Sequence, residues 1–171
     1  SLGWFIDDID MYTCQASVHS TFLPAVTKPG VPNPAFHDAF TSSAGDWEVE
    51  NGNWALTGGY MATETPALSI NSISREFSSL NFDYSVRLRR TGCASCATGV
   101  VIRGNPDPLD VFGMWRDGYA MLINNNGEFA VFFFNSGSLT VLQNWTASSA
   151  INQGNDYQSG GWNIIRVVGN G

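Results

Sequence analysis

The stretch that most constrains this chain is Trp4–Tyr12, WFIDDIDMY, which is rich in aromatic and β-branched residues and has no glycine or proline. This composition is typical of a β-strand. Alternation along a strand divides its apolar residues between two faces: Phe5, Ile9 and Met11 on one, and Trp4, Ile6 and Tyr12 on the other. Alone in water, such a strand exposes unpaired backbone groups and large rings. It therefore has to join a sheet, either in its own chain or in a neighbouring molecule.

The segment that follows is predicted to be a connector. Residues 15–35 carry four prolines and little periodicity, which indicates an extended, semi-stiff linker. A linker of this length can carry residues 1–14 back to their own domain or across to another molecule. The sequence leaves both arrangements open.

From residue 36 onward, short apolar runs alternate with glycine-rich turn signals, and no convincing helix is found. This pattern predicts an all-β sandwich or jelly roll over residues 36–171. Asn124–Gly127, NNNG, predicts a hairpin turn. Strands are expected near residues 36–40, 46–50, 53–57, 59–64, 67–76, 80–90, 98–104, 111–115, 118–124, 127–134, 138–145 and 162–168.

Composition excludes several classes of partner. The 171 residues suffice for one domain with a core. The net charge of −7 comes with no basic stripe, which argues against nucleic acid, and no apolar run approaches the ~20 residues that span a bilayer. Low charge and eighteen glycines favour an extracellular location, where the sequon at Asn144 is a candidate glycosylation site.

Several segments resemble a known architecture. GDWEVENGNWALTGGY, FDYSVRLRRTG, GYAMLINNNGEFAVFFF and WNIIRVVGNG are similar to the laminin-G/concanavalin-A-like jelly roll of bacterial secreted proteins, over residues 36–171. The fold implied by this resemblance hosts lectins, hydrolases and inert spacers alike. GWFIDDIDMYTC resembles the closing strand of a β-sandwich ancillary domain from secreted bacterial proteins, although such a strand normally stands at a C-terminus.

The resemblance implies a mismatch between the two ends. In such domains a strand like WNIIRVV is followed by several more, so residues 36–171 are expected to lack their last strands. A strand of the closing type precedes them instead. This arrangement favours strand donation between copies, which builds a non-catalytic extracellular filament at the cell surface. The alternative is a laminin-G-like carbohydrate-binding or adhesion module whose own strand completes it.

For insertion of the Trp4–Tyr12 strand into a sheet, the free energy gained by side-chain burial roughly equals the entropy cost of ordering the strand. Burying Trp4, Phe5, Ile9 and Met11 contributes ~6–10 kcal/mol. Ordering nine residues costs ~1–2 kcal/mol apiece in backbone entropy. We therefore expect this strand to enter only a groove that is already formed.

No enzyme is predicted. Glucanases of the concanavalin-A-like class alternate three acids along one strand, whereas this chain offers only Glu48 and Glu50. Two such carboxylates more often lie on the solvent-exposed face of an edge strand. Neither His19 nor His37 has a serine or cysteine in a nucleophile context.

The densest acid cluster is Asp7, Asp8 and Asp10, which is a candidate Ca²⁺ site with Asp38 as a further ligand. The chain has no spaced calcium loop, and no other cofactor is expected. The alternative interpretation is that Asp7 and Asp8 mark a β-bulge or a sheet edge and interact with arginines.

Three cysteines predict one disulfide and one odd thiol. Cys93 and Cys96 are expected to form a local loop disulfide, because no further ligands suggest zinc. Cys14 is then a free thiol or pairs between subunits.

Aromatic rings can stack on sugar rings. Trp47, Trp54, Trp115, Trp145 and Tyr60 are the candidates for glycan binding, and the first three are preferred. The alternative is that they belong to the core, as most aromatic residues of a sandwich do.

Overall fold

The computed structural model describes the backbone of residues 3–13 and residues 36–41, 43, 45–64, 70–156 and 158–170. Within these residues the protein is all-β and has no helix, so none is long and apolar enough to cross a membrane. The strands are β1 Gly3–Thr13, β2 Phe36–Asp38, β3 Glu48–Asn51, β4 Trp54–Thr57, β5 Tyr60–Glu64, β6 Ser72–Ser74, β7 Phe82–Thr91, β8 Thr98–Ile102, β9 Gly118–Ile123, β10 Glu128–Asn135, β11 Ser138–Ala147 and β12 Asn163–Gly169.

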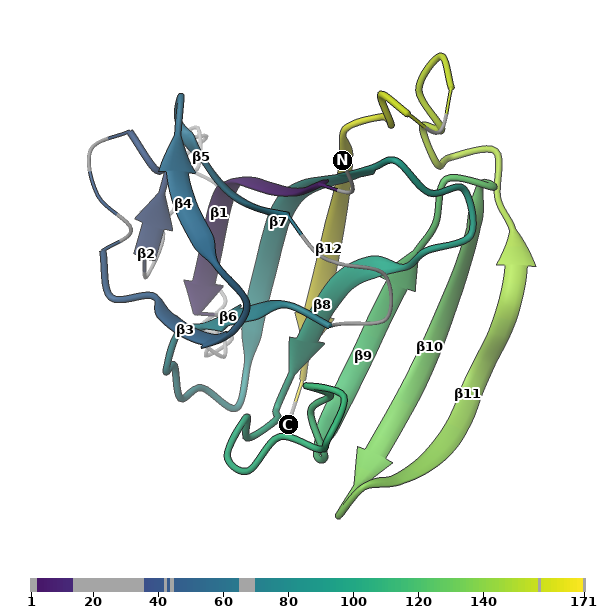
Figure 1. The fold of residues 1–171 in the computed structure, drawn as a ribbon. Coiled ribbons are helices and arrows are strands. Elements are labelled where there is room, and N and C mark those ends of the chain that lie inside the picture. Colours follow the sequence, from purple (N-terminus) through teal and green to yellow (C-terminus); the bar gives the residue numbers. More distant parts are fainter. Residues whose placement is uncertain are drawn as a thin grey trace, which may run out of the picture.

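These strands form three antiparallel sheets (Figure 1). The largest has the order β12-β7-β1-β5-β4, with β2 also paired to β1. A second sheet has the order β11-β10-β9-β8, and β3 pairs with β6 in a third. An all-β fold of several antiparallel sheets is therefore confirmed.

The core lies between the six-stranded and four-stranded sheets. β7 alternates strictly between buried and half-buried residues, so its even-numbered side chains face the core. Leu88 and Val86 are fully enclosed, and residues of β8, β10 and β12 pack around them. On the opposite face, Asp83 accepts hydrogen bonds from the guanidinium of Arg166 on β12, which lowers the pKa of the Asp83 carboxyl.

β1 occupies a central position in the six-stranded sheet. Its whole length pairs with β7 on one side. On the other side, Gly3–Ile6 pairs with β5 and Ile9–Met11 pairs with β2. Of the two arrangements open to this strand, the structure contains the one within its own chain.

The predicted division of β1 into two apolar faces is wrong, because a β-bulge interrupts the alternation. Ile6 pairs with Leu88, and Asp7 with Arg87, but the next paired residue is Ile9, opposite Val86. Asp8 is the extra residue, as the bulge interpretation predicted. Partners in an antiparallel ladder share a face, so Ile6 and Ile9 both stand opposite core positions of β7.

The strands predicted from residue 36 onward are present, with one exception. Residues 111–115 form a turn, because Asp110 accepts hydrogen bonds from the backbone N–H groups of Phe112 and Met114, both at 2.8 Å, and Gly113 has φ +80°. The predicted strand 67–76 is represented by β6 among the residues described. The predicted hairpin at Asn124–Gly127 is confirmed by a hydrogen bond from Gly127 N–H to Asn124 O, at 3.2 Å.

Candidate functional site

A cleft of about 1370 Å³ opens where the β3–β6 sheet meets β7 and β8. Its floor is apolar and comes from the core faces of these two strands, including Val86, Leu88, Val100 and Ile102. Its rim is polar and comes mainly from residues 46–50, 72–76 and 103–107. A concave apolar surface with a few polar groups at its edge is the usual form of a small-ligand site.

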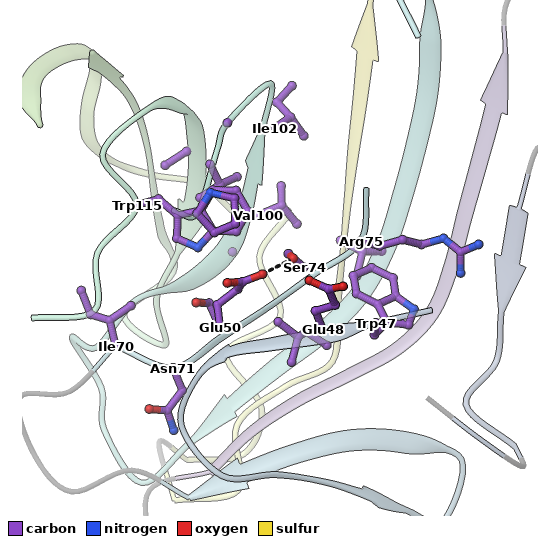
Figure 2. A pocket seen from close by; sticks show the side chains of 18 of the residues that line it. Trp47, Glu48, Glu50, Ile70, Asn71, Ser74, Arg75, Val100, Ile102 and Trp115 are labelled. Atoms are coloured by element: carbon purple, nitrogen blue, oxygen red, sulfur yellow. Dashed lines mark hydrogen bonds between the residues drawn. The ribbon is translucent and has the colours of Figure 1, made fainter. Parts of the chain in front are cut away.

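Two carboxylates enter the cleft from β3. Glu48 and Glu50 stand two residues apart, and both line the cavity. Glu50 accepts a hydrogen bond from the Ser74 hydroxyl on β6. Figure 2 shows the two carboxylates and Ser74 between Trp115 on one side and Trp47 and Arg75 on the other. The carboxylates offer several acceptor positions to a ligand held between the rings.

Arg75 supplies one positive charge at the rim, and Arg103 supplies another. Its Nη2 donates to Asp46 Oδ2 at 2.8 Å, and its guanidinium lies 4.4 Å from the ring centre of Phe36. These contacts hold a planar group with five donors at the rim, where it points away from the two glutamates in Figure 2. The rim therefore carries side chains of both charges.

The three preferred tryptophans line this cleft, whereas the other two candidates, Trp145 and Tyr60, do not. Trp47 packs against Phe36 and Phe40 and donates from Nε1 to Asp38 at 3.1 Å. Trp54 donates from Nε1 to the carbonyl of Asn51, also at 3.1 Å. Each ring is half-buried, so its position is fixed while part of its surface stays accessible.

Trp115 comes from a different part of the chain, the segment between β8 and β9. Gly104 makes room for it, since a Cβ at that position would stand 2.9 Å from the Trp115 ring and 2.6 Å from the Asp117 carbonyl. The half-buried ring lies over β8 in Figure 2. It is therefore the tryptophan least tied to the core cluster.

Arg90 lies deeper in the cleft. It is buried, and its Nη1 donates to the Ala97 carbonyl at 3.1 Å. Burial lowers the pKa of its guanidinium to about 10, and burial also raises the pKa of the Tyr84 phenol, six residues away on the same strand. Both groups belong to β7 and line the cavity. Polar atoms therefore reach the floor as well as the rim.

The candidate calcium site remains a prediction. Asp7, Asp8 and Asp10 stand at the bulge of β1, where the structure describes the backbone alone. The carboxylate of Asp38, the proposed further ligand, accepts from the Phe40 N–H at 2.8 Å and from the Trp47 indole. No group of three metal-ligating residues is found among the side chains described.

The predicted local disulfide is present between Cys93 and Cys96, whose Cα atoms are 5.4 Å apart. Asn125 ties this loop to β7 by donating to the carbonyls of Cys93 and Arg90, at 3.2 and 3.0 Å. Cys14 and the linker lie outside the described residues. The sequon residue Asn144 is exposed on β11, at an edge of the four-stranded sheet.

Sequence reasoning missed Ser74, Arg75 and Asp46 as parts of this site. Ser74 belongs to a three-residue strand, and its pairing with Glu48 joins positions 26 residues apart. Nothing in the local pattern indicates that pairing. Arg75 and Asp46 meet only because this pairing forms.

Comparison with known proteins identifies no family: no family model, no curated protein and no solved structure matches the chain.

Proposed function

We propose that this protein is a secreted, laminin-G-like carbohydrate-binding module that holds a glycan in the cleft between β3, β6 and β8. The jelly-roll resemblance of residues 36–171 supports this proposal, and so does the Cys93–Cys96 disulfide, because disulfides persist mainly in oxidising compartments. No catalytic step is assigned to Glu48 and Glu50, whose role is to accept hydrogen bonds from sugar hydroxyls.

The observation that carries the proposal is the convergence of three tryptophans and two glutamates on one cleft. Ring faces stack on the apolar faces of sugars, while carboxylates and Arg75 hydrogen-bond to the hydroxyls around them. Trp115 and Trp47 stand on opposite sides of the carboxylates in Figure 2, so a ligand spanning the cleft meets both kinds of group.

Trp115→Ala is expected to weaken glycan binding at least tenfold, because it removes a half-buried platform and leaves the core cluster intact. The measurement is a glycan array followed by titration calorimetry with the best ligand. Trp145→Ala is the matched control, since Trp145 lies on β11 against Phe132 and does not line the cleft. Equal affinity of wild type and Trp115→Ala would contradict the proposal.

The fit of β1 to the groove between β5 and β7 supports a second proposed function. We propose that copies assemble into an extracellular filament when β1 of one molecule occupies the groove between β5 and β7 of the next. The bulge at Asp8 matches both halves of β1 to core positions of β7, and Asp7 stands opposite Arg87. These features suit the strand to this groove, whichever molecule supplies it.

Ile9→Asp is expected to abolish such a filament, because it puts a charge opposite the buried Val86. Sedimentation velocity and negative-stain microscopy of the full chain provide the measurement. Ile164→Asp is the control, since Ile164 is 68% exposed on β12. A wild-type protein that sediments as a monomer at all accessible concentrations contradicts the filament and leaves the glycan proposal standing.

A further inference from the structure

Trp162, directly before β12, joins strands that are not neighbours in the sheet. Its ring centre lies 4.5 Å from the guanidinium carbon of Arg87 and 4.8 Å from that of Arg89, both on β7. It also meets the ring of Tyr60, the first residue of β5, with centroids 6.0 Å apart and planes inclined by 67°. Arg87 and Arg89 alternate with the buried residues of β7, so this cluster lies on the solvent face of the sheet.

The sheet order decides what lies beneath these contacts. β1 stands between β5 and β7, and neighbouring strands are ~4.8 Å apart, so β5 and β7 are separated by roughly 10 Å. A contact from Trp162, beside β12, to Tyr60 on β5 therefore crosses the outer face of β1. We infer that Trp162, Tyr60, Arg87 and Arg89 form a latch that retains β1 in its groove.

The segment that carries Trp162 is itself firmly held. Asn163 donates from its side-chain amide to the carbonyls of Asn152 and Gly161, both at 3.0 Å, and Asn152 N–H donates to Asn163 Oδ1 at 2.8 Å. Gly160 packs directly on β7, since a Cβ there would stand 1.9 Å from the Arg90 carbonyl oxygen. The ring is thus anchored to β7 and β12 and reaches over β1 from that side.

The latch controls how readily β1 leaves the sheet. Backbone hydrogen bonds to β5, β2 and β7 hold the strand at its edges, whereas the aromatic and cation–π contacts close its outer face. Opening these contacts exposes the strand without disturbing the four-stranded sheet. The inference applies whether the strand in the groove belongs to the same chain or to a neighbour.

Hydrogen exchange followed by mass spectrometry on the full chain tests the latch. In Trp162→Ala, amides of residues 3–13 are expected to exchange roughly tenfold faster, while those of β9 and β10 keep the wild-type rate. Tyr60→Ala removes one contact and leaves both arginine contacts, so it is expected to accelerate the same amides to a smaller extent. Phe112→Ala, at a 65% exposed ring outside the cluster, is the control.

Two results would overturn the latch: unchanged exchange of residues 3–13 in Trp162→Ala, or equal acceleration of every strand in both Trp162→Ala and Tyr60→Ala. If Trp162→Ala does not fold, Tyr60→Ala alone decides between these outcomes. The oligomeric state is measured on the same samples, so failure of the filament is distinguished from failure of the latch.

Discussion

A chain that lacks residues 1–13 is expected to lose its cooperative folded state. β1 is the strand that joins β12-β7 to β5-β4 in the six-stranded sheet, so its removal leaves two separate pairs and takes away the strand with which β2 pairs. Both β5 and β7 then lose a ladder, and the core beneath Leu88 and Val86 opens to water. The free energy of unfolding of a domain is only about 5–15 kcal/mol. We expect the loss of the two ladders and of the core packing to exceed it. Thermal unfolding monitored by far-UV circular dichroism measures the effect.

A synthetic peptide of residues 1–13 added to the truncated chain is expected to restore the transition. Coupled insertion of a strand into a sheet gains main-chain hydrogen bonds on both sides. The same peptide with Ile9→Asp is the control and is expected to fail, because Ile9 pairs with the buried Val86. A truncated chain that melts at the wild-type temperature without peptide would show that β1 is dispensable.

The second large effect concerns single deletions within β1. Removal of Asp10 is expected to destabilise the fold by several kcal/mol, because Met11 and Tyr12 then shift by one residue and exchange faces. Met11 normally pairs with the buried Tyr84. Removal of Asp8 is expected to cost far less, since it takes out the residue that has no partner in the β7 ladder.

These two deletions form a matched pair, since each removes one aspartate and shortens the chain by one residue. Urea unfolding at equilibrium gives the free energy of each variant. If the two deletions lower the free energy of unfolding equally, the pairing register of β1 with β7 on either side of the bulge does not determine the stability of the fold.

Local pattern predicted most of the fold. The strand β7 was predictable because its apolar and polar residues alternate with the period of two that a strand requires. The turns were predictable because glycine adopts backbone conformations that other residues rarely adopt. The faces of β1 were predicted wrongly because a bulge shifts the period by one residue. The strand predicted at 111–115 fails because the Asp110 side chain bonds two following backbone N–H groups and favours a turn over a ladder.

The candidate site was predictable only in parts. The chemistry of the tryptophan ring indicates three candidates individually, Trp47, Trp54 and Trp115. Nothing in the sequence places them on one cleft. Their meeting depends on the long-range pairing of β3 with β6 and on the close approach at Gly104. Such pairings reflect the whole fold rather than local propensity, so Ser74 and Arg75 had no signal of their own.

The central position of β1 also determines the order of events during synthesis. β1 is synthesised before β7, yet its longest ladder is to β7, which begins at Phe82. At 5–20 residues per second, the 69 residues from Thr13 to Phe82 take roughly 4–14 s to add. For that interval β1 has been synthesised and β7 has not, so the backbone groups of β1 that pair with β7 have no partner in that ladder. The place of β1 in the sheet therefore delays completion of the six-stranded sheet until β7 has been synthesised.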